Sequence, residues 1–529
     1  MLQKKIVVVG AGTSGWIAAS AIKKNLPDLD VTIVYDSKIP TIGVGETLNF
    51  GMPFIMRNIL GINDDQWMNR VKSTYKIAIL HKDWTENEHQ YGGHCLDFPA
   101  KLLLKGVLEN PLALTHAAHR DSVDQYYPNG GIVDLWYTLY QQGKLGEISK
   151  QDLSLSLSEN AWFAKNNRSI RTTAGDWLTN SGYGHSYHFD AELMGTVIGD
   201  LVGKPAGVKV VDSNVARVEI DNGNIKQLHL ENGQTLSGDL FIDCTGFKRI
   251  LVSALDYRWI AADEFANDSA MVTQIKYSNV DHPQHKISQT TTLAAMKQGW
   301  RFSIPLQHRS GNGYVFNSRH VKNETQIADE FASTLAIDQQ DFRIIKWSPG
   351  RYEYPAKNNC VALGLSQGFT DPFDANNLNI TLKLMRAMIE NINTDRDTWI
   401  TDLQNVLNHH SQYWWTDIHM RVESCLRLSP RRDTEHYRMM ADNAERTNLR
   451  ERFIEHVTNS RIQDYSHEHR MIWPSFVHVV TALRYDIPLP YTEYDNDLEM
   501  LAKQYFDFRK IKYQILSQRA PSHSDFYQN

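Results

Sequence analysis

A glycine-rich turn near the start of the chain constrains its fold more than any other feature. Four apolar residues run directly into Gly10, Gly12 and Gly15, and an alanine-rich segment follows. In a strand–turn–helix unit with this spacing, the first glycine allows the tight turn, the second lets the backbone approach a pyrophosphate, and the third lets the helix pack closely on the strand. A second strand-like run ends in Asp36, near the spacing at which a carboxylate binds a ribose hydroxyl. The sequence therefore predicts a dinucleotide-binding unit, which at this point fits either NAD or FAD.

The length and composition are those of a large enzyme without a strongly charged partner. A chain of 529 residues exceeds the roughly 250–300 residues at which a single core stops growing, so two or more structural units are expected. The net charge of -6 gives no electrostatic reason to expect a nucleic acid or an anionic membrane as partner. The four cysteines lack C-x-x-C spacing, which is typical of reduced thiols, and no apolar run reaches the ~18 residues of a membrane span. We therefore expect a cytoplasmic protein.

Strand and helix patterns alternate in the first part of the chain, and helical patterns fill the last. Short strand-like runs separated by Asn-Gly turns occupy residues 207–243, and further strand-like runs lie at 74–80 and 360–365. From about residue 391 the pattern is mainly helical and aromatic. We predict an α/β fold in two parts: a nucleotide-binding domain with inserted substrate-binding elements over residues 1–390, and a helical subdomain over residues 391–529.

Two later strand-to-loop segments favour FAD over NAD. One places Asp243 and Gly246 at the end of a strand-like run, and the other begins at Gly364 and is again rich in glycine. Three glycine-bearing strand ends dispersed along one chain match the discontinuous FAD fold better than a contiguous NAD domain.

With these segments in view, the chain resembles the flavin-dependent halogenases of the tryptophan-halogenase type. Any one matching segment would be weak, but the set follows the family's order over roughly residues 5–380. The matching segments are 10–16, 40–46, 187–191, 241–247, 299–305 and 364–377. The resemblance implies an α/β fold whose FAD-binding domain is like that of the flavin monooxygenases. It implies cofactor contacts at Gly10, Gly12, Thr13, Ser14, Gly15, Trp16, Asp36, Gly43, Val44, Gly45, Glu46, Asp243, Gly246 and Gly364.

The resemblance also implies a reaction in two stages. A separate flavin reductase delivers reduced FAD, which reacts with O₂ to a C4a-hydroperoxide, and a halide ion (chloride, bromide or iodide) attacks the distal oxygen to give hypohalous acid. The oxidised halogen then crosses an internal tunnel to a lysine beside a small aromatic substrate. This separation excludes water and controls a diffusible reagent. The expected substrate is an electron-rich aromatic compound of the indole or phenol type.

Lys76 matches the catalytic lysine of the family. It alternates onto the same strand face as Ala78 and Leu80, so its ammonium group is expected to be partly desolvated. A desolvated lysine has a depressed pKa and can donate a strong hydrogen bond to hypohalous acid or form a haloamine. Without the resemblance, the same pattern fits a solvated lysine on a half-exposed strand. Lys82 is the alternative lysine on the same run.

The tunnel signature of the family is altered in this chain. Trp300, Phe302 and Pro305 fall on it, and the family has a second tryptophan at the position of Phe302. Aromatic bulk is retained, so the barrier between oxidant and substrate is expected to survive with a changed lining. Without the resemblance, a buried strand with alternating apolar residues shows the same pattern.

The segment before the helix near residue 380 departs further from the family. Asp374 falls on the carboxylate that assists the lysine or takes the proton from the arenium intermediate, and it is one methylene shorter than the usual glutamate. Asn376 and Asn377 fall on the two residues whose backbone amides hold the halide. Because asparagine tolerates positive φ better than most residues, halide binding is expected to persist, with bromide or iodide preferred over chloride. The same residues also suit an N-cap and turn.

Other interpretations of the chain stay open at this stage. His188 and Asp190 are expected to have structural roles in the flavin domain. The histidine pairs at 409–410 and 467–469 lack the spacing of a zinc site, so no metal is expected. An aromatic monooxygenase that hydroxylates its substrate with FAD and its own NAD(P)H would share the fold without needing Lys76, and a redox-silent flavin-binding protein is a third possibility. A homo-oligomer is also left open.

Overall fold

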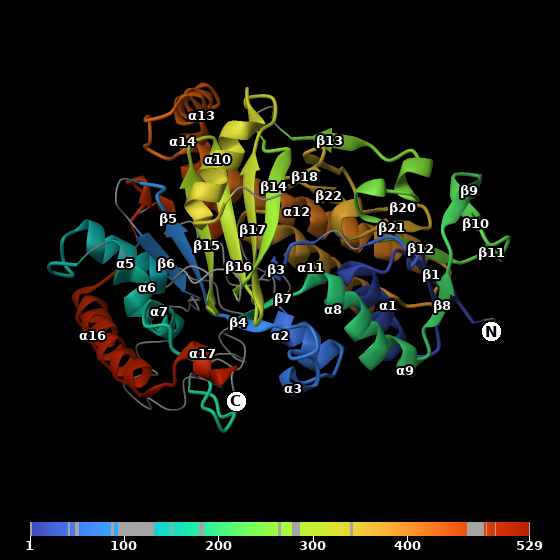
Figure 1. Cartoon of the computed structure of the whole chain (residues 1–529), viewed down its shortest axis with the longest axis horizontal. Coiled ribbons are helices and arrows are strands. Elements are labelled where there is room, and N and C mark those ends of the chain that lie inside the picture. Colours follow the sequence, from blue (N-terminus) through green and yellow to red (C-terminus); the bar gives the residue numbers. More distant parts are fainter. Residues whose placement is uncertain are drawn as a thin grey trace. The chain divides into compact units, whose positions relative to one another are not determined.

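Figure 1 shows the computed structural model of the chain with its elements labelled. The structure describes residues 3–40, 43–47, 52–85, 89–93, 132–148, 150, 152–178, 185–262, 266–277, 286–338, 342–462, 481–482, 484–491 and 494–527. The chain forms two compact units, each assembled from three stretches of sequence. The first unit comprises Met1–Tyr75, Ser186–Lys286 and Ser303–Ile418, and the second comprises Lys76–His185, Ile287–Phe302 and His419–Asn529. The domain boundary near residue 390 stays a prediction.

A mainly parallel six-stranded sheet carries the nucleotide-binding part of the first unit. Its strands run in the order β20-β21-β12-β1-β2-β8. Their bounds are β20 Ala356–Lys357, β21 Cys360–Ala362, β12 Leu240–Asp243, β1 Lys5–Val9, β2 Asp30–Tyr35 and β8 Lys209–Asp212. All neighbours pair in parallel except β20 and β21. Ile6, Ile33 and Ile242 are fully buried, as expected for strands covered on both faces.

The helix predicted after the glycine-rich turn is confirmed. Helix α1 (Thr13–Asn25) connects β1 to β2 and contacts α8 (Ala191–Ile198), the π-helical turn η3 (Gly199–Gly203) and α11 (Asn376–Asn391). The hairpin predicted at Asn222 and Gly223 is also confirmed, because β9 (Val215–Asp221) and β10 (Asn224–Leu230) pair antiparallel. The two turn residues have φ values of 47° and 79°, the signs that a two-residue hairpin turn requires.

Three further groups of strands lie wholly or mainly in the first unit. Strand β14 (Ser269–Lys276) pairs antiparallel with β17 (Arg309–Phe316) and β18 (Arg343–Lys346). Strand β7 (Ser186–Phe189) lies between β3 (Glu46–Thr47) and β4 (Thr74–Lys76). Strand β19 (Gly350–Tyr352) lies between β13 (Trp259–Ala261) and β22 (Gly368–Phe369). The remaining elements of this unit are β11 Thr235–Leu236, α2 Met52–Phe54, η1 Ile55–Ile59, α3 Asp64–Trp67, α9 Lys204–Ala206, η4 Gly246–Lys248, η5 Val252–Ala254, α10 Glu324–Leu335, η7 Gly364–Ser366 and η8 Phe373–Ala375.

The second unit combines a small group of strands with several helices. Strand β5 (Ala78–Lys82) pairs in parallel with β15 (Thr290–Met296) and antiparallel with β6 (His89–Gly93). Its helices are α5 Ile132–Gln141, α6 Asp152–Leu157, α7 Glu159–Lys165, α13 Glu435–Arg446, α14 Leu449–Ile462, α16 Asn496–Arg519 and α17 His523–Phe526. Strand β4, strand β16 (Gly299–Pro305) and helix α12 (Trp399–Arg427) contain residues of both units.

The run predicted as one strand over residues 74–80 is two strands. Ile77 separates β4 from β5, and its N–H donates to the carbonyl oxygen of Gln289 at 2.9 Å. In the described part of the chain, no helix combines the length and the apolar character needed to cross a bilayer. His467 and His469 lie outside the described residues. The residues that the structure describes contain no cluster of three or more His, Cys, Asp or Glu side chains that could hold a metal ion.

Candidate active site

The glycine-rich turn after β1 has the geometry of a phosphate-binding loop. Gly10 has a φ of 100°, and a Cβ there would stand 2.3 Å from the carbonyl oxygen of Cys244. A Cβ on Gly15 would stand 1.9 Å from the carbonyl oxygen of Gly10, so only glycine lets α1 begin this close to the strand. At Gly12, by contrast, a Cβ would meet no atom within 4 Å. This open space and the lack of a side-chain cap on α1 fit a phosphate group at the helix N-terminus.

The predicted strand ends meet at this turn. A Cβ on Gly364, which has a φ of 68°, would stand 2.7 Å from Oγ of Ser14. Gly246 has a φ of 65° and, like Gly12, open space on its Cβ side. The structure therefore brings Ser14 and Gly364, 350 positions apart in the printed sequence, to one place.

Asp243 organises these loops instead of presenting a free oxygen. Its Oδ1 accepts hydrogen bonds from the N–H and the Oγ1 of Thr245 and from Oγ of Ser366, at 2.9, 2.7 and 3.0 Å. Its Oδ2 accepts from the N–H groups of Leu251 and Val252 at 2.8 and 3.0 Å. With both oxygens occupied and no exposed surface, the carboxylate fixes the loop that contains Gly246.

Asp36 lies directly after the end of β2 and Trp16 lies in α1, as the sequence predicted. The two side chains differ in their surroundings. Asp36 follows β2, and its Oδ2 accepts from Nδ2 of Asn214 at 3.0 Å. The indole of Trp16 is buried, and a Cβ on Gly199 would stand 2.7 Å from it. Its side chain therefore packs α1 against η3, and the cofactor contact expected at Trp16 stays a prediction. Thr13 and Ser14 are the first two residues of α1.

The segment around Gly43, Val44 and Gly45 packs tightly on the first unit, and we call residues 43–47 the strap. A Cβ on Gly43 would stand 2.6 Å from Cβ of Ala191, and Gly45 has a φ of 118°. A Cβ on Gly311 of β17 would stand only 1.8 Å from the carbonyl oxygen of Val44. The strap therefore lies directly on β17, and its last two residues form β3 against β7.

A buried ion pair holds the strap in place. Nη1 of Arg309 donates to the carbonyl oxygen of Val44 at 2.8 Å, and its Nη2 pairs with Oδ2 of Asp190 at 2.7 Å. Asp190 also caps α8, because its Oδ1 accepts from the N–H of Glu192 at 3.0 Å. Removing one member of such a pair leaves an uncompensated buried charge. The sequence did not identify Arg309, although an arginine at the start of a glycine-rich strand was a usable signal.

Glu46 of the strap titrates near neutral pH. Burial raises the pKa of its carboxyl group from 4.5 to about 7. Near neutral pH this side chain can therefore both donate and accept a proton, which an ordinary glutamate cannot.

Strand β4 is anchored at the residue two positions before Lys76. Oγ1 of Thr74 donates to the carbonyl oxygen of Pro305 at 2.7 Å and lies 2.9 Å from Nδ1 of His188. Oγ of Ser73 donates to the carbonyl oxygen of His188 at 2.7 Å. The predicted structural roles of His188 and Asp190 thus correspond to holding β4 and the strap. Thr74 itself was not foreseen, because its two partners lie far away in the sequence.

Lys76 ends β4 and is fully buried. It has 0% exposed surface, and Tyr75 and Ile77 beside it are buried as well, so the chain is covered on both sides at this point. The expectation of partial desolvation therefore understated its burial. Burial and the nearby charges of Arg484 and Lys76 hold the pKa of His81 well below its usual value, so this imidazole is neutral.

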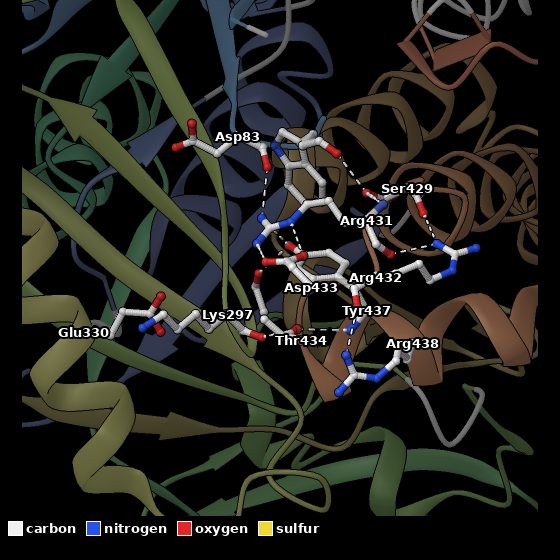
Figure 2. A network of polar contacts seen from close by, with 12 residues as sticks. Asp83, Lys297, Glu330, Ser429, Arg431, Arg432, Asp433, Thr434, Tyr437 and Arg438 are labelled. Carbon is white, nitrogen blue, oxygen red and sulfur yellow. Dashed lines mark hydrogen bonds and ion pairs between the residues drawn. The ribbon is translucent and has the colours of Figure 1, made fainter. Parts of the chain in front are cut away.

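A polar network braces the strand that follows Lys76 and the turn that precedes Trp300 (Figure 2). Arg431 pairs with Asp433 at 2.7 Å and donates to the carbonyl oxygen of Asp83, just after β5, at 3.0 Å. Oγ1 of Thr434 donates to the carbonyl oxygen of Lys297, in the turn before β16, at 2.9 Å. The aromatic ring of Tyr437 lies 4.1 Å from the Arg431 guanidinium.

The three tunnel candidates lie on one strand, β16. Trp300 and Phe302 are buried, with ring centroids 6.0 Å apart and a tilt of 55°. The carbonyl oxygen of Pro305 is the acceptor for Thr74. Both aromatic side chains belong to the second unit, as Lys76 does, whereas the nucleotide turn, the strap and Asp374 belong to the first.

The segment after β22 ends at the start of helix α11. Asp374 and Ala375 both have a φ of 55°, whereas Asn376 begins the helix with a φ of -69°. The tolerance of asparagine for positive φ is therefore not used here, because the left-handed residues come just before the two asparagines. The side chains of these asparagines point back along the chain, with Nδ2 donating to the carbonyl oxygens of Phe373 and Asp371 at 2.8 and 3.0 Å. Their backbone amides belong to the first turn of a helix that has no side-chain cap.

Comparisons with known proteins agree with this geometry. The tryptophan halogenase family matches residues 5–494. Tryptophan 7-halogenase RebH of Lentzea aerocolonigenes is 28% identical over 445 residues, which cover 82% of this chain and 78% of RebH. Tryptophan 6-halogenase SttH of Streptomyces toxytricini is 30% identical over 379 residues, which cover 70% of this chain and 68% of SttH.

Solved structures share the fold over the whole length. The crystal structure of SttH superposes with a TM-score of 0.82 at 23% identity and covers 100% of both chains. Xcc4156, a flavin-dependent halogenase from Xanthomonas campestris, superposes with a TM-score of 0.80 at 23% identity, covering 100% of this chain and 98% of its own. The predicted α/β fold with a helical C-terminal region is confirmed as that of the flavin-dependent halogenases. The chain belongs to the tryptophan halogenase family. It is a flavin-dependent halogenase, and its family implies FAD and a halide ion.

Proposed function

We propose that this enzyme halogenates an electron-rich aromatic compound of the indole or phenol type, with hypohalous acid relayed to Lys76. The observation that carries the proposal is the complete burial of Lys76 at the end of β4. A lysine without solvent contact has no ordinary surface role, and a dry site protects an oxidised halogen from water. The altered segment at Asp374 argues against assuming that free tryptophan is the substrate.

The nucleotide turn and the strap fit FAD. The open space at Gly12 and the uncapped start of α1 would receive its pyrophosphate, and the loops of Gly246 and Gly364 meet beside that turn. Reduced FAD, supplied by a separate flavin reductase, would deliver the electrons that turn O₂ and halide into hypohalous acid. The strap, held by Arg309 and Asp190, would keep its backbone in one position as the cofactor enters and leaves.

The start of α11 is the proposed halide site. Helix N-termini attract anions because their first N–H groups lack acceptors within the helix and the helix dipole is positive there. The amides of Asn376 and Asn377 are in this first turn, preceded by the left-handed Asp374 and Ala375. Bromide or iodide is the expected preference at this altered site.

Asp374 and Lys76 have separate proposed tasks. Lys76 would hold the oxidised halogen, either through a hydrogen bond from its ammonium group or as a haloamine. The buried Asp374 carboxylate would take the proton that leaves the ring carbon after halogen addition. Trp300 and Phe302 would line the passage of hypohalous acid with bulky apolar surface.

One incubation separates the three possible activities. The purified protein is supplied with FAD, a flavin reductase, NADH and an indole or phenol, with chloride, bromide, iodide or no halide, and products are analysed by mass spectrometry. We expect halide-dependent replacement of one hydrogen by halogen. Halide-independent gain of one oxygen would identify a monooxygenase, and FAD binding without either product would identify a redox-silent flavoprotein.

A further inference from the structure

A buried carboxylate in the first unit gathers hydrogen-bond donors from two neighbouring strands. Asp64 is the first residue of α3, and the N–H of Asn63 before it donates to Oε1 of Gln66 at 2.7 Å, which fixes this helix end. Oδ2 of Asp64 accepts from the hydroxyl of Tyr75, in β4, at 3.0 Å. Its Oδ1 accepts from the hydroxyl of Tyr187, in β7, at 2.7 Å. One acidic side chain therefore joins the side chains of two strands that are neighbours in the same sheet.

An arginine and two buried phenols complement this carboxylate. Nη2 of Arg57, in η1, pairs with Oδ2 of Asp64 at 2.9 Å. Burial, together with the adjacent charge of Asp64, raises the pKa of Tyr187 well above its usual value, so this hydroxyl remains a donor. The ring centroid of Tyr187 lies 4.7 Å from that of Trp67 and 5.9 Å from that of Tyr75, so packing fixes the rings as well. The name Asp64 cluster is used below for Arg57, Asp64, Tyr75 and Tyr187.

The Asp64 cluster holds the residue directly before Lys76. Successive side chains of a strand point to opposite faces, so Tyr75 and Thr74 leave β4 on different sides. On one side the hydroxyl of Thr74 donates to the carbonyl oxygen of Pro305, and on the other the hydroxyl of Tyr75 donates to Asp64. Strand β4 is therefore anchored from both of its faces at the two positions that precede Lys76.

We propose that Asp64 is a positioning residue for Lys76 and acts through the hydroxyl of Tyr75. This inference rests on the proposed function, in which Lys76 holds the oxidised halogen. A lysine side chain is long and flexible, so the place that its amine reaches depends on a backbone fixed at its base. Replacing a buried ion pair by apolar side chains is often neutral or stabilising, so stability by itself does not explain the buried Asp64. A directional bond to the residue before Lys76 gives this carboxylate a use in the reaction.

Displacement of Lys76 should separate the two stages of the proposed reaction. Hypohalous acid would still form, because the Asp64 cluster contains no residue assigned to FAD or to the halide. Less of it would be transferred to the aromatic ring, since a misplacement of about 1 Å can cost about a hundredfold in rate. The unused acid would leave the protein. A purely structural defect would instead lower FAD binding and the yields of product and acid together, so the ratio of product to released acid tells the two apart.

Tyr75→Phe removes the hydroxyl and keeps the ring, and Tyr314→Phe is the matched control. Tyr314 is also buried, and its hydroxyl donates to Oε2 of Glu330 at 2.9 Å. Each variant is supplied with FAD, a flavin reductase, NADH, bromide and an indole. Brominated indole is measured together with hypobromous acid trapped by an added diketone, and FAD binding and urea unfolding are followed in parallel. We expect Tyr75→Phe to lower the ratio of brominated indole to trapped acid roughly tenfold with FAD binding unchanged, and Tyr314→Phe to keep the wild-type ratio.

Asp64→Asn tests whether Tyr75 acts through Asp64. This variant should lower the same ratio, and the double variant Asp64→Asn, Tyr75→Phe should lower it no further, because both changes break one hydrogen bond. If Asp64→Asn does not fold, the comparison of Tyr75→Phe with Tyr314→Phe decides. Equal ratios in those two variants, or a double variant in which the two single losses multiply, would overturn the inference.

Lys76→Met in the same assay separates this inference from the proposed function on which it rests. Trapped hypobromous acid without brominated indole supports the proposed role of Lys76, and the ratio measured for Tyr75→Phe then decides the inference about Asp64. Brominated indole formed by Lys76→Met at the wild-type rate would overturn both.

Discussion

Replacing Gly12 by alanine should weaken FAD binding while leaving the folded protein intact. A Cβ at Gly12 meets no protein atom within 4 Å, and the backbone there (φ -68°, ψ -173°) is extended, which alanine adopts without strain. The small loss of N-cap preference is offset by the lower entropy of the unfolded chain, so the free energy of unfolding should change by no more than about 1 kcal/mol. The added methyl group would occupy the space assigned to the pyrophosphate. Overpacking of this kind costs roughly 1–3 kcal/mol, which corresponds to about a 5- to 150-fold rise in the dissociation constant of FAD.

Gly15→Ala provides the contrast within the same turn. Its Cβ would stand 1.9 Å from the carbonyl oxygen of Gly10, so the strand and α1 must move apart. This variant should therefore unfold at lower denaturant concentration even without FAD. Both proteins are compared by urea unfolding of the FAD-free form and by titration of flavin fluorescence. If Gly12→Ala binds FAD as wild type does, or is destabilised as much as Gly15→Ala, the phosphate does not lie against Gly12 and the reasoning is refuted.

Three further outcomes follow from buried polar groups. His523 is fully buried and its pKa is lowered to about 3, so the imidazole stays neutral in the folded protein, whereas it takes up a proton below pH 6.5 in the unfolded chain. Urea unfolding should therefore show a loss of about 2 kcal/mol in the free energy of unfolding between pH 8 and pH 5, and a smaller loss in His523→Leu. The pH dependence due to Glu46 has the opposite sign, because the pKa of this carboxyl group is raised in the folded protein. The free energy of unfolding of the FAD-free protein should fall by up to ~3 kcal/mol as the pH rises from 4.5 through about 7, and Glu46→Gln should remove this fall. Thr74→Val breaks the contacts of β4 with Pro305 and His188, so it should lower product formation without weakening FAD binding. Thr458→Val loses only a hydrogen bond within its own helix and should leave product formation unchanged. Equal product yields from the two variants would show that Thr74 does not position Lys76.

The sequence predicted the nucleotide turn well because its determinants are local. Gly10 has a positive φ, Gly15 packs against the carbonyl oxygen of Gly10 in the same turn, and Gly12 leaves open space, so the spacing of the three glycines carries the geometry. The hairpin at Asn222 and Gly223 was predictable for the same reason, since positive φ is a property of the turn residues themselves.

The sequence could not show the anchoring of the strap and of β4. Asp190 and Arg309 are 119 residues apart, and Thr74 and Pro305 are 231 residues apart, so no local pattern records their contacts. The burial of Lys76 was underestimated because alternation along a strand shows only which residues share a face, not whether that face is covered. At Lys76 both faces of the strand are covered. The left-handed conformation of Asp374 and Ala375 was not foreseen, because neither residue type favours it and the start of α11 imposes it.

The most direct test of the central claim compares Lys76→Met with Lys82→Met. Methionine keeps the length and apolar stem of the side chain but removes the amine, and Lys82 is a partly exposed lysine on the neighbouring strand β5. Halogenated product is measured with FAD, a flavin reductase, NADH, bromide and an indole, and FAD binding is measured in parallel. The account predicts that Lys76→Met binds FAD normally and forms no brominated product, while Lys82→Met retains wild-type activity. Brominated product from Lys76→Met at the wild-type rate would contradict it.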